Sequence, residues 1–221
     1  FPLLLALFPS IAQSLATGAG EAAARYVRRS LAYAFLLLCP LAVGSFFVAR
    51  DVLGTFYGTE YLDAAFIVGP LVIATLFYTL YALLDTHIRS SGNAALSLRI
   101  AGAILLLHIG LNLVLIPRQQ MWGCVISMLV SSVLACLVAG LSVRRELGLA
   151  IPWLAAGKAL VFAYVAFVPF HFWDPGDGKE SVLFAVPCLG LYVLLLAIGG
   201  VLRRKDFERF RSLPGLLIGR G

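Results

Sequence analysis

The chain has 221 residues, of which 61% are hydrophobic and 13% are charged, and its formal net charge is +6. The charged share is about half that of an ordinary soluble domain, and the mean hydropathy is +0.96. A soluble fold of this size cannot bury so much apolar surface. These values exclude a soluble globular domain and predict a protein whose solvent is lipid.

Polar or turn-forming segments divide the chain into seven apolar runs. They cover residues 1–15, 31–49, 64–84, 96–116, 121–143, 153–173 and 181–202. All but the first have about 20 residues, enough to cross a hydrocarbon core about 30 Å thick as an α-helix. The predicted fold class is therefore an all-α polytopic transmembrane helix bundle of about seven helices. The first run is short and starts at Phe1, so we expect a C-terminal fragment whose first helix is truncated.

The stretch 112–127 joins two of these runs by a very short connection. The fourth run ends at Ile116, proline cannot continue a helix, and Arg118 and the two glutamines after it require water. We therefore expect a tight turn over 117–120, with the loop 16–30 and the loop 50–63 as longer connections earlier in the chain.

Small residues recur at every fourth position of the fifth run. They are Gly123, Ser127, Ser131, Ala135 and Ala139. A spacing of four keeps them near one helix face, and small residues let helix backbones approach closely in lipid. This pattern predicts a packing face.

Prolines and cysteines inside the apolar runs carry structural predictions as well. Pro40, Pro70 and Pro187 lie near mid-span, and each frees a carbonyl group that a neighbour or cavity water must satisfy. The four cysteines have no metal-binding spacing, and we expect them to fill small apolar spaces. They are Cys39, Cys124, Cys136 and Cys188.

Basic residues are distributed unevenly between alternate loops. Twelve of them fall in one set of loops and the tail 203–221, whereas only Arg50, Arg118 and Lys179 fall in the other. Lys and Arg accumulate in cytoplasmic loops. The pattern predicts a multi-pass protein of the cell membrane with a cytoplasmic C-terminus. The twelve are Arg25, Arg28, Arg29, Arg89, Arg144, Arg145, Arg203, Arg204, Lys205, Arg209, Arg211 and Arg220.

Polar side chains within or beside the runs are the candidates for a substrate-lined cavity, because burying them in lipid is costly. Ser97, His108 and Asn112 share one face of the fourth run, and Thr75, Tyr78, Tyr81 and Asp85 form a stripe on the third. Two interpretations remain open for both faces, hydrogen bonding between helices and the lining of a cavity. The candidate binding residues are Tyr78, Tyr81, Asp85, Arg99, His108, Asn112 and Lys158.

Two cations have their own alternatives. Arg99 lies on a different face from His108 and near the predicted cytoplasmic boundary, so it could reach the headgroups or contact an anionic substrate. Lys158 lies about a turn and a half beyond Trp153 and has the same two interpretations. The basic, aromatic tail suits the anionic inner leaflet better than nucleic acid. No cofactor, metal site or catalytic arrangement is predicted, so an enzyme is not expected.

Several segments resemble a known family in their order and spacing. They are 8–12 (Phe-Pro-Ser-Ile-Ala), 56–65 (Phe-Tyr-Gly-Thr-Glu-Tyr-Leu-Asp-Ala-Ala), and 112–117 (Asn-Leu-Val-Leu-Ile-Pro) followed by Gly123. The chain resembles the C-terminal half of polysaccharide-biosynthesis membrane proteins, the O-antigen and exopolysaccharide flippases of the multidrug/oligosaccharidyl-lipid/polysaccharide exporter superfamily. It departs from their pattern at 119–124, where Gln-Gln-Met-Trp-Gly-Cys is bulkier than the family's glycine and small residues.

The resemblance implies a fold and an activity. Residues 1–145 would form one lobe of a MATE-like transporter, 146–202 would add two C-terminal spans, and 203–221 a basic cytoplasmic tail. The partner would be the missing N-terminal half. The substrate would be a lipid-linked oligosaccharide on a polyprenyl diphosphate carrier, moved from the inner to the outer leaflet. Three alternatives stay open: a multidrug or cation antiporter, a lipid II flippase, and a structural subunit of a polysaccharide export assembly.

Overall fold

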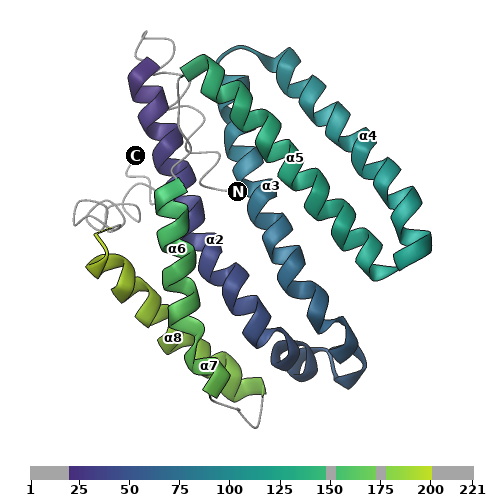
Figure 1. The fold of residues 1–221 in the computed structure, drawn as a ribbon, viewed down its shortest axis with the longest axis vertical. Helices are drawn as coiled ribbons and strands as arrows, with labels where there is room; N and C mark the ends of the chain where they lie inside the picture. Colours follow the sequence, from purple (N-terminus) through teal and green to yellow (C-terminus); the bar gives the residue numbers. More distant parts are fainter. Residues whose placement is uncertain (1–19, 148–152, 173–177, 201–221) are drawn as a thin grey trace, which may run out of the picture.

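The computed structural model describes residues 20–147, 153–172 and 178–200, and every regular element in these ranges is a helix (Figure 1). Five helical segments are long and apolar enough to cross a membrane. They are Val27–Phe56, Thr59–Ser90, Ala94–Gln119, Met121–Arg145 and Lys179–Ile198. The chain is an all-α polytopic membrane protein, as its composition predicts. The expected span 1–15 and tail 203–221 lie outside the described residues.

The helix α2 (Gly20–Phe56) is longer than the span expected at 31–49. The expected loop 16–30 is wrong from Gly20 onward, because Glu21 to Arg29 are mostly alanine, arginine and glutamate, which favour helix. With 37 residues, α2 is about 55 Å long and exceeds the hydrocarbon thickness. The end that carries Arg25, Arg28 and Arg29 therefore extends beyond the membrane.

A short 3-10 helix, η1 (Thr59–Ala64), connects α2 to α3 (Ala65–Ser90). The expected loop 50–63 is thus shorter than predicted, because its first seven residues belong to α2. Gly58 ends α2 with φ at 98°, a conformation that favours glycine. Its amide donates a hydrogen bond of 3.1 Å to the carbonyl oxygen of Leu53, which satisfies one carbonyl group at the helix end.

The turn between α4 (Ala94–Gln119) and α5 (Met121–Leu147) is shorter than the sequence predicts. Pro117 does not end the helix, since α4 continues to Gln119. The proline lies in the last turn, so the backbone hydrogen bond lost with its N–H group is one of the last in α4. Gln120 alone makes the reversal, with φ at 51° and ψ at −121°. Its amide donates to the carbonyl oxygen of Ile116 at 2.8 Å.

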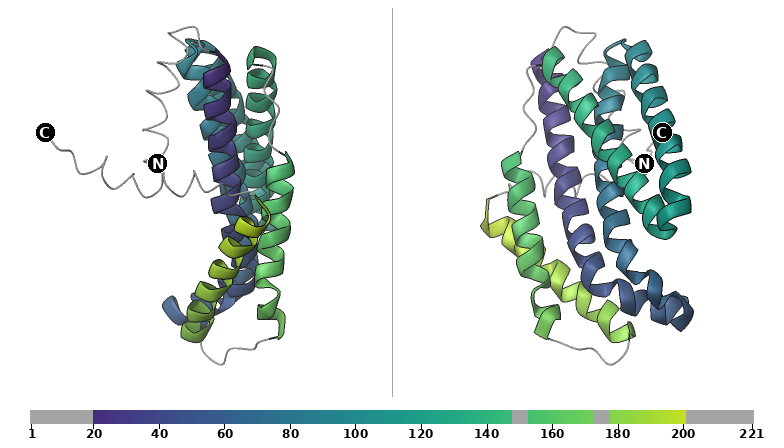
Figure 2. Two further views of the ribbon diagram at one scale, coloured as in Figure 1. Left: turned by 90° about the vertical axis from the view of Figure 1, so that its left-hand side faces the viewer. Right: turned by 45° about the vertical axis from the view of Figure 1, so that its right-hand side comes forward.

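The small residues of α5 form a packing face, as predicted. Gly123, Ser127, Ser131, Ala135 and Ala139 are all buried. α5 packs mainly on α3 and α4, α3 packs also on α2, and α4 has few contacts with α3. The helices therefore follow one another in space in the order α4, α5, α3, α2, and Figure 2 shows α4 at one edge of the molecule.

The C-terminal helices pack against the other side of α2 (Figure 1). The sixth span expected at 153–173 is divided, because α6 (Trp153–Phe167) ends before Pro169 and the short α7 (Pro169–Phe172) follows. With 15 residues, α6 is about 22 Å long and shorter than the hydrocarbon core. The seventh span expected at 181–202 is α8 (Gly178–Ile198).

Small residues and two hydroxyl groups, those of Ser181 and Tyr192, hold this C-terminal unit to α2. Ala156, Ala159, Ala163 and Ala166 form a buried stripe along α6. On α8, the hydroxyl of Tyr192 donates a hydrogen bond of 2.8 Å to the carbonyl oxygen of Leu36. Pro40 frees that carbonyl group because it has no N–H to donate four residues back along α2. The expectation that a neighbour satisfies the carbonyl freed by a mid-span proline is met here.

Three of the four cysteines fill apolar space as predicted. Cys39, Cys136 and Cys188 are buried, whereas Cys124 is exposed near the start of α5. The prediction is therefore wrong for Cys124, because its position lies off the buried stripe that begins at Gly123.

Candidate functional site

A cluster of paired polar side chains lies where α3 ends and α4 begins. Asp85 is buried, and its Oδ1 atom accepts a hydrogen bond of 2.5 Å from the hydroxyl of Ser97 on α4. Its Oδ2 atom forms a salt bridge of 2.8 Å with Arg89, one turn further along α3. A buried carboxylate is costly unless it is paired and hydrogen-bonded. Here both oxygens have a partner, and the contact joins α3 to α4.

Two tyrosines continue this cluster along α3 towards the middle of the membrane. The rings of Tyr78 and Tyr81 are 6.1 Å apart between centroids and inclined at 51°. Tyr81 is buried, but 53% of Tyr78 is exposed. Tyr78, Asp85 and Arg89 lie at spacings that keep them on one side of α3. This side of α3 therefore presents two exposed polar side chains, those of Tyr78 and Arg89.

His108 and Asn112 belong to a different place, the contact between α4 and α5. His108 Nδ1 lies 3.2 Å from Ser131 Oγ and 3.4 Å from the carbonyl oxygen of Ser127. For His108 the structure therefore bears out the interpretation as interhelical hydrogen bonding. The side-chain carbonyl oxygen of Asn112 is buried and has no hydrogen-bond partner among the described residues.

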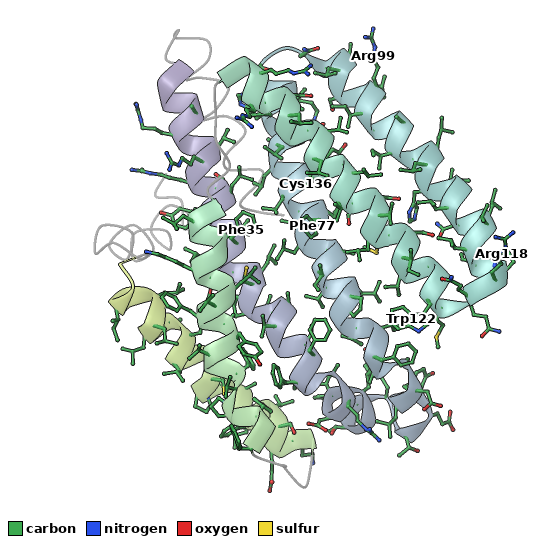
Figure 3. The ribbon with its side chains drawn as sticks, viewed as in Figure 1. Phe35, Phe77, Arg99, Arg118, Trp122 and Cys136 are labelled. Carbon is green, nitrogen blue, oxygen red and sulfur yellow. The ribbon has the colours of Figure 1, made fainter. Side chains whose placement is uncertain are left out.

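The two candidate cations lie apart from these groups. Arg99 is exposed near the start of α4 and points away from α5 (Figure 3). Lys158 is exposed on α6, which packs on α2 and α8. The structure brings Tyr78, Tyr81 and Asp85 together and places His108 with Asn112 elsewhere, so the seven candidates do not line a single cavity in this chain.

Arg89, which the charge pattern of the sequence marks only as a loop residue, belongs to the polar cluster. Its spacing of four from Asp85 is the spacing at which opposite charges meet on a helix, so the sequence does contain a signal for this pair. The contact with Ser97 has no comparable signal, because it depends on how α4 returns along α3.

The two ends of the helices differ in charge. The beginnings of α2 and α4 and the ends of α3 and α5 lie at one end of the molecule, which carries Arg25, Arg28, Arg29, Arg89, Arg144 and Arg145 (Figure 1). The opposite end carries Arg50, Arg118 and Lys179. The described helices therefore place the two sets of basic residues on opposite sides, as an antiparallel arrangement requires.

No protein-family model matches this chain, and no curated protein matches it either. The five long apolar helices among the described residues make the chain a polytopic membrane protein.

Proposed function

We propose that this chain forms one lobe of a membrane flippase that moves a lipid-linked oligosaccharide from the inner to the outer leaflet. The carrier would be a polyprenyl diphosphate, and the product would serve cell-surface polysaccharide synthesis. A second lobe would complete the transport path, and the spans between 146 and 202 would be additional helices. The resemblance of 8–12, 56–65 and 112–117 to such flippases supports this proposal.

One structural observation carries the proposal, the exposed polar side of α3. Tyr78 lies about halfway along a spanning helix, and its ring is more exposed than buried. A hydroxyl group facing hydrocarbon finds no hydrogen-bond partner, so such a side chain favours contact with protein or with a water-filled cavity. A cavity between two lobes would give Tyr78 that environment.

The chemistry along this side suits a sugar diphosphate. Aromatic rings provide flat, amphipathic surfaces for contact with sugars. Arg89 lies three turns from Tyr78 towards the basic end and leaves about half of its side chain exposed. Arginine binds phosphate oxygens in a bidentate manner. Arg99, exposed on α4, is a second cation at the same end.

A cation antiporter of the same superfamily is the second candidate, because Asp85 is a buried carboxylate in a spanning helix. An antiporter requires a carboxylate that can bind a cation or a proton during transport. Arg89 already neutralises Asp85, and Ser97 donates to it. This pairing favours the flippase.

The proposal is tested by Tyr78→Ala in the protein that contains this chain. We expect about a fivefold loss of surface polysaccharide, because the contact of an aromatic ring with the substrate would contribute about 1 kcal/mol. Lipid-linked oligosaccharide should accumulate on the inner leaflet at the same time. Tyr164→Ala is the matched control, since Tyr164 is another exposed tyrosine but lies on α6, away from the polar side of α3.

Protein levels in the membrane must be equal for the comparison to hold. Unchanged polysaccharide in Tyr78→Ala at equal protein level would contradict the proposal. Arg99→Ala and Asn112→Ala belong in the same series, and wild-type polysaccharide in both would remove these two residues from the site. Cation-coupled drug efflux that is lost in Asp85→Asn, with polysaccharide unchanged, would favour the antiporter instead.

A further inference from the structure

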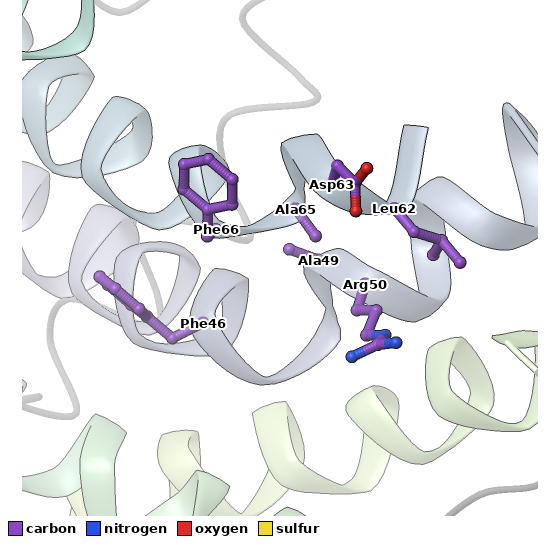
Figure 4. A pocket seen from close by; sticks show the side chains of 7 residues that line it. All are labelled: Phe46, Ala49, Arg50, Leu62, Asp63, Ala65 and Phe66. Carbon is purple, nitrogen blue, oxygen red and sulfur yellow. The ribbon is translucent and has the colours of Figure 1, made fainter. Parts of the chain in front are cut away.

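A pocket of about 480 Å³ lies at the end of the molecule opposite the basic end, between the end of α2, η1 and the start of α3 (Figure 4). Its charged lining residues are Arg50 on α2 and Asp63 on η1, and its large apolar ones are Phe46, Leu62 and Phe66. None of these residues belongs to the polar cluster around Asp85.

The two charges of the pocket are available to a ligand. Arg50 and Asp63 are both exposed, and neither forms a salt bridge or a side-chain hydrogen bond with another described residue. In Figure 4 the guanidinium group of Arg50 points away from the carboxylate of Asp63. Opposite charges that line one pocket without pairing suit a ligand that carries both a negative and a positive group.

An aromatic ring lies close in sequence to each charge of the pocket. Phe46 precedes Arg50 by four residues on α2, which runs towards this surface, and residues at this spacing share a helix face. The wall formed by α2 therefore has a charge at the membrane surface and a ring roughly 6 Å below it. On the returning chain, Phe66 lies in the first turn of α3, three residues after Asp63 of η1.

The rings are held in place by neighbouring helices. Phe66 stacks on Trp122 of α5, with centroids 5.1 Å apart and an interplanar angle of 28°. The ring of Phe46 lies against Gly69 of α3, where an added Cβ atom would be 2.6 Å from the ring. About half of each ring remains exposed. The apolar walls are thus fixed surfaces that an acyl chain can contact.

We infer that this pocket binds a zwitterionic phospholipid, with Arg50 on the phosphate, Asp63 on the ammonium group, and Phe46 and Phe66 along the acyl chain. Phosphatidylethanolamine fits this arrangement because its ammonium group donates hydrogen bonds to a carboxylate. Phosphatidylglycerol has the same phosphate but no cation for Asp63. The inference does not depend on the proposed flippase activity.

Native mass spectrometry of the full chain in detergent, with dioleoyl phosphatidylethanolamine or dioleoyl phosphatidylglycerol added, tests this site. The wild type should bind the first lipid about tenfold more tightly, as expected for one charge-assisted hydrogen bond. Asp63→Asn should bring the ratio of the two affinities close to one. Arg50→Ala should weaken the binding of both lipids about tenfold.

Matched controls come from the same end of the molecule. Glu60→Gln removes another exposed acidic residue of η1, and Arg118→Ala removes another exposed arginine, and neither residue lines the pocket. Both variants should bind the two lipids as the wild type does. Equal affinities of the wild type for the two lipids would overturn the inference, and so would a control variant that matches Asp63→Asn. Glycerophosphoethanolamine without acyl chains should not compete, and competition at equal concentration would overturn the commitment to a lipid.

Discussion

Tyr192 replaces a hydrogen bond that Pro40 removes from α2. Its hydroxyl reaches the carbonyl oxygen of Leu36, which is 156 residues away in sequence. An unsatisfied buried carbonyl group costs about 1–3 kcal/mol. At the scale of single residues, this contact explains how a proline is accommodated near the middle of a membrane helix.

We predict that Tyr192→Phe lowers the free energy of unfolding by about 1–3 kcal/mol, measured by denaturation of the chain purified in detergent. In a Pro40→Ala background the same change should cost much less, because the new amide can donate to Leu36. Such non-additivity is what coupled residues show. Tyr164→Phe, on an exposed ring of α6, should be neutral. Equal losses in the two backgrounds would show that Tyr192 does not act through the proline.

Gln120 adopts a backbone conformation that residues other than glycine rarely take. Its φ of 51° with ψ of −121° costs of order 1–3 kcal/mol in strain. Gln120→Gly should therefore raise the melting temperature of the purified chain by a few degrees. Ala101→Gly, at an exposed interior position of α4, should lower it, since glycine weakens a helix interior. A fall in melting temperature for both variants would disprove the strain.

At the scale of helices, the contact between α4 and α5 depends on Gly123. A Cβ atom there would meet the main-chain carbonyl of Leu115, which is backbone and cannot rotate away. Small residues at such contacts allow the close approach that replaces hydrophobic driving force in lipid. The packing face of α5, from Gly123 to Ala139, is therefore required for the contact between these two helices.

Gly123→Ala should consequently destabilise the chain by about 2 kcal/mol or more, seen as a lower melting temperature, because α4 must move away from α5. Gly110→Ala on α4 is the control, as an added Cβ atom there meets nothing within 4 Å. That change should be neutral or slightly stabilising, since alanine favours helix over glycine. If both changes had the same effect, the close approach at Gly123 would not matter.

Helix positions follow from the sequence better than helix ends do. Each described apolar run contains a helix, because lipid requires backbone hydrogen bonds to be satisfied within the segment. The positions of the helix ends depend on helix propensity and on where prolines lie, and hydropathy contains neither. The segment of α2 that carries Arg25, Arg28 and Arg29 continues the helix into water, Pro117 is tolerated in the last turn of α4, and Pro169 divides the run at 153–173.

At the scale of the whole molecule, the basic ends of α2, α3, α4 and α5 define one membrane side. We predict that a membrane-impermeant maleimide added to intact cells labels Gln119→Cys, and labels Ser91→Cys only after permeabilisation. Cys124 should be changed to serine in both variants, because it is exposed. Thr59→Cys on η1 should behave as Gln119→Cys does. Labelling of Ser91 and Gln119 from the same side would contradict the predicted topology.

Hydropathy and residue spacing are enough to predict the lipid surroundings, the all-α fold class and the packing face of α5. The hydropathy of the chain requires lipid, and the small residues from Gly123 to Ala139 mark the buried face of α5 because residues four apart stay on one side of a helix. The sequence could also have indicated the Asp85–Arg89 pair, which is local. Helical periodicity, however, places the candidate residues only on a face of their own helix, and it does not say which helices face each other.

Contacts between distant segments follow from the packing of the helices and not from any local pattern. This packing brings Tyr192 to the carbonyl group that Pro40 frees and Ser97 to Asp85. It also brings His108 to Ser131 on the packing face of α5. The same packing brings Arg50 and Asp63 to one pocket. The reason is physical: polar groups in lipid must find partners within the protein, and which partners are within reach depends on the order and rotation of packed helices.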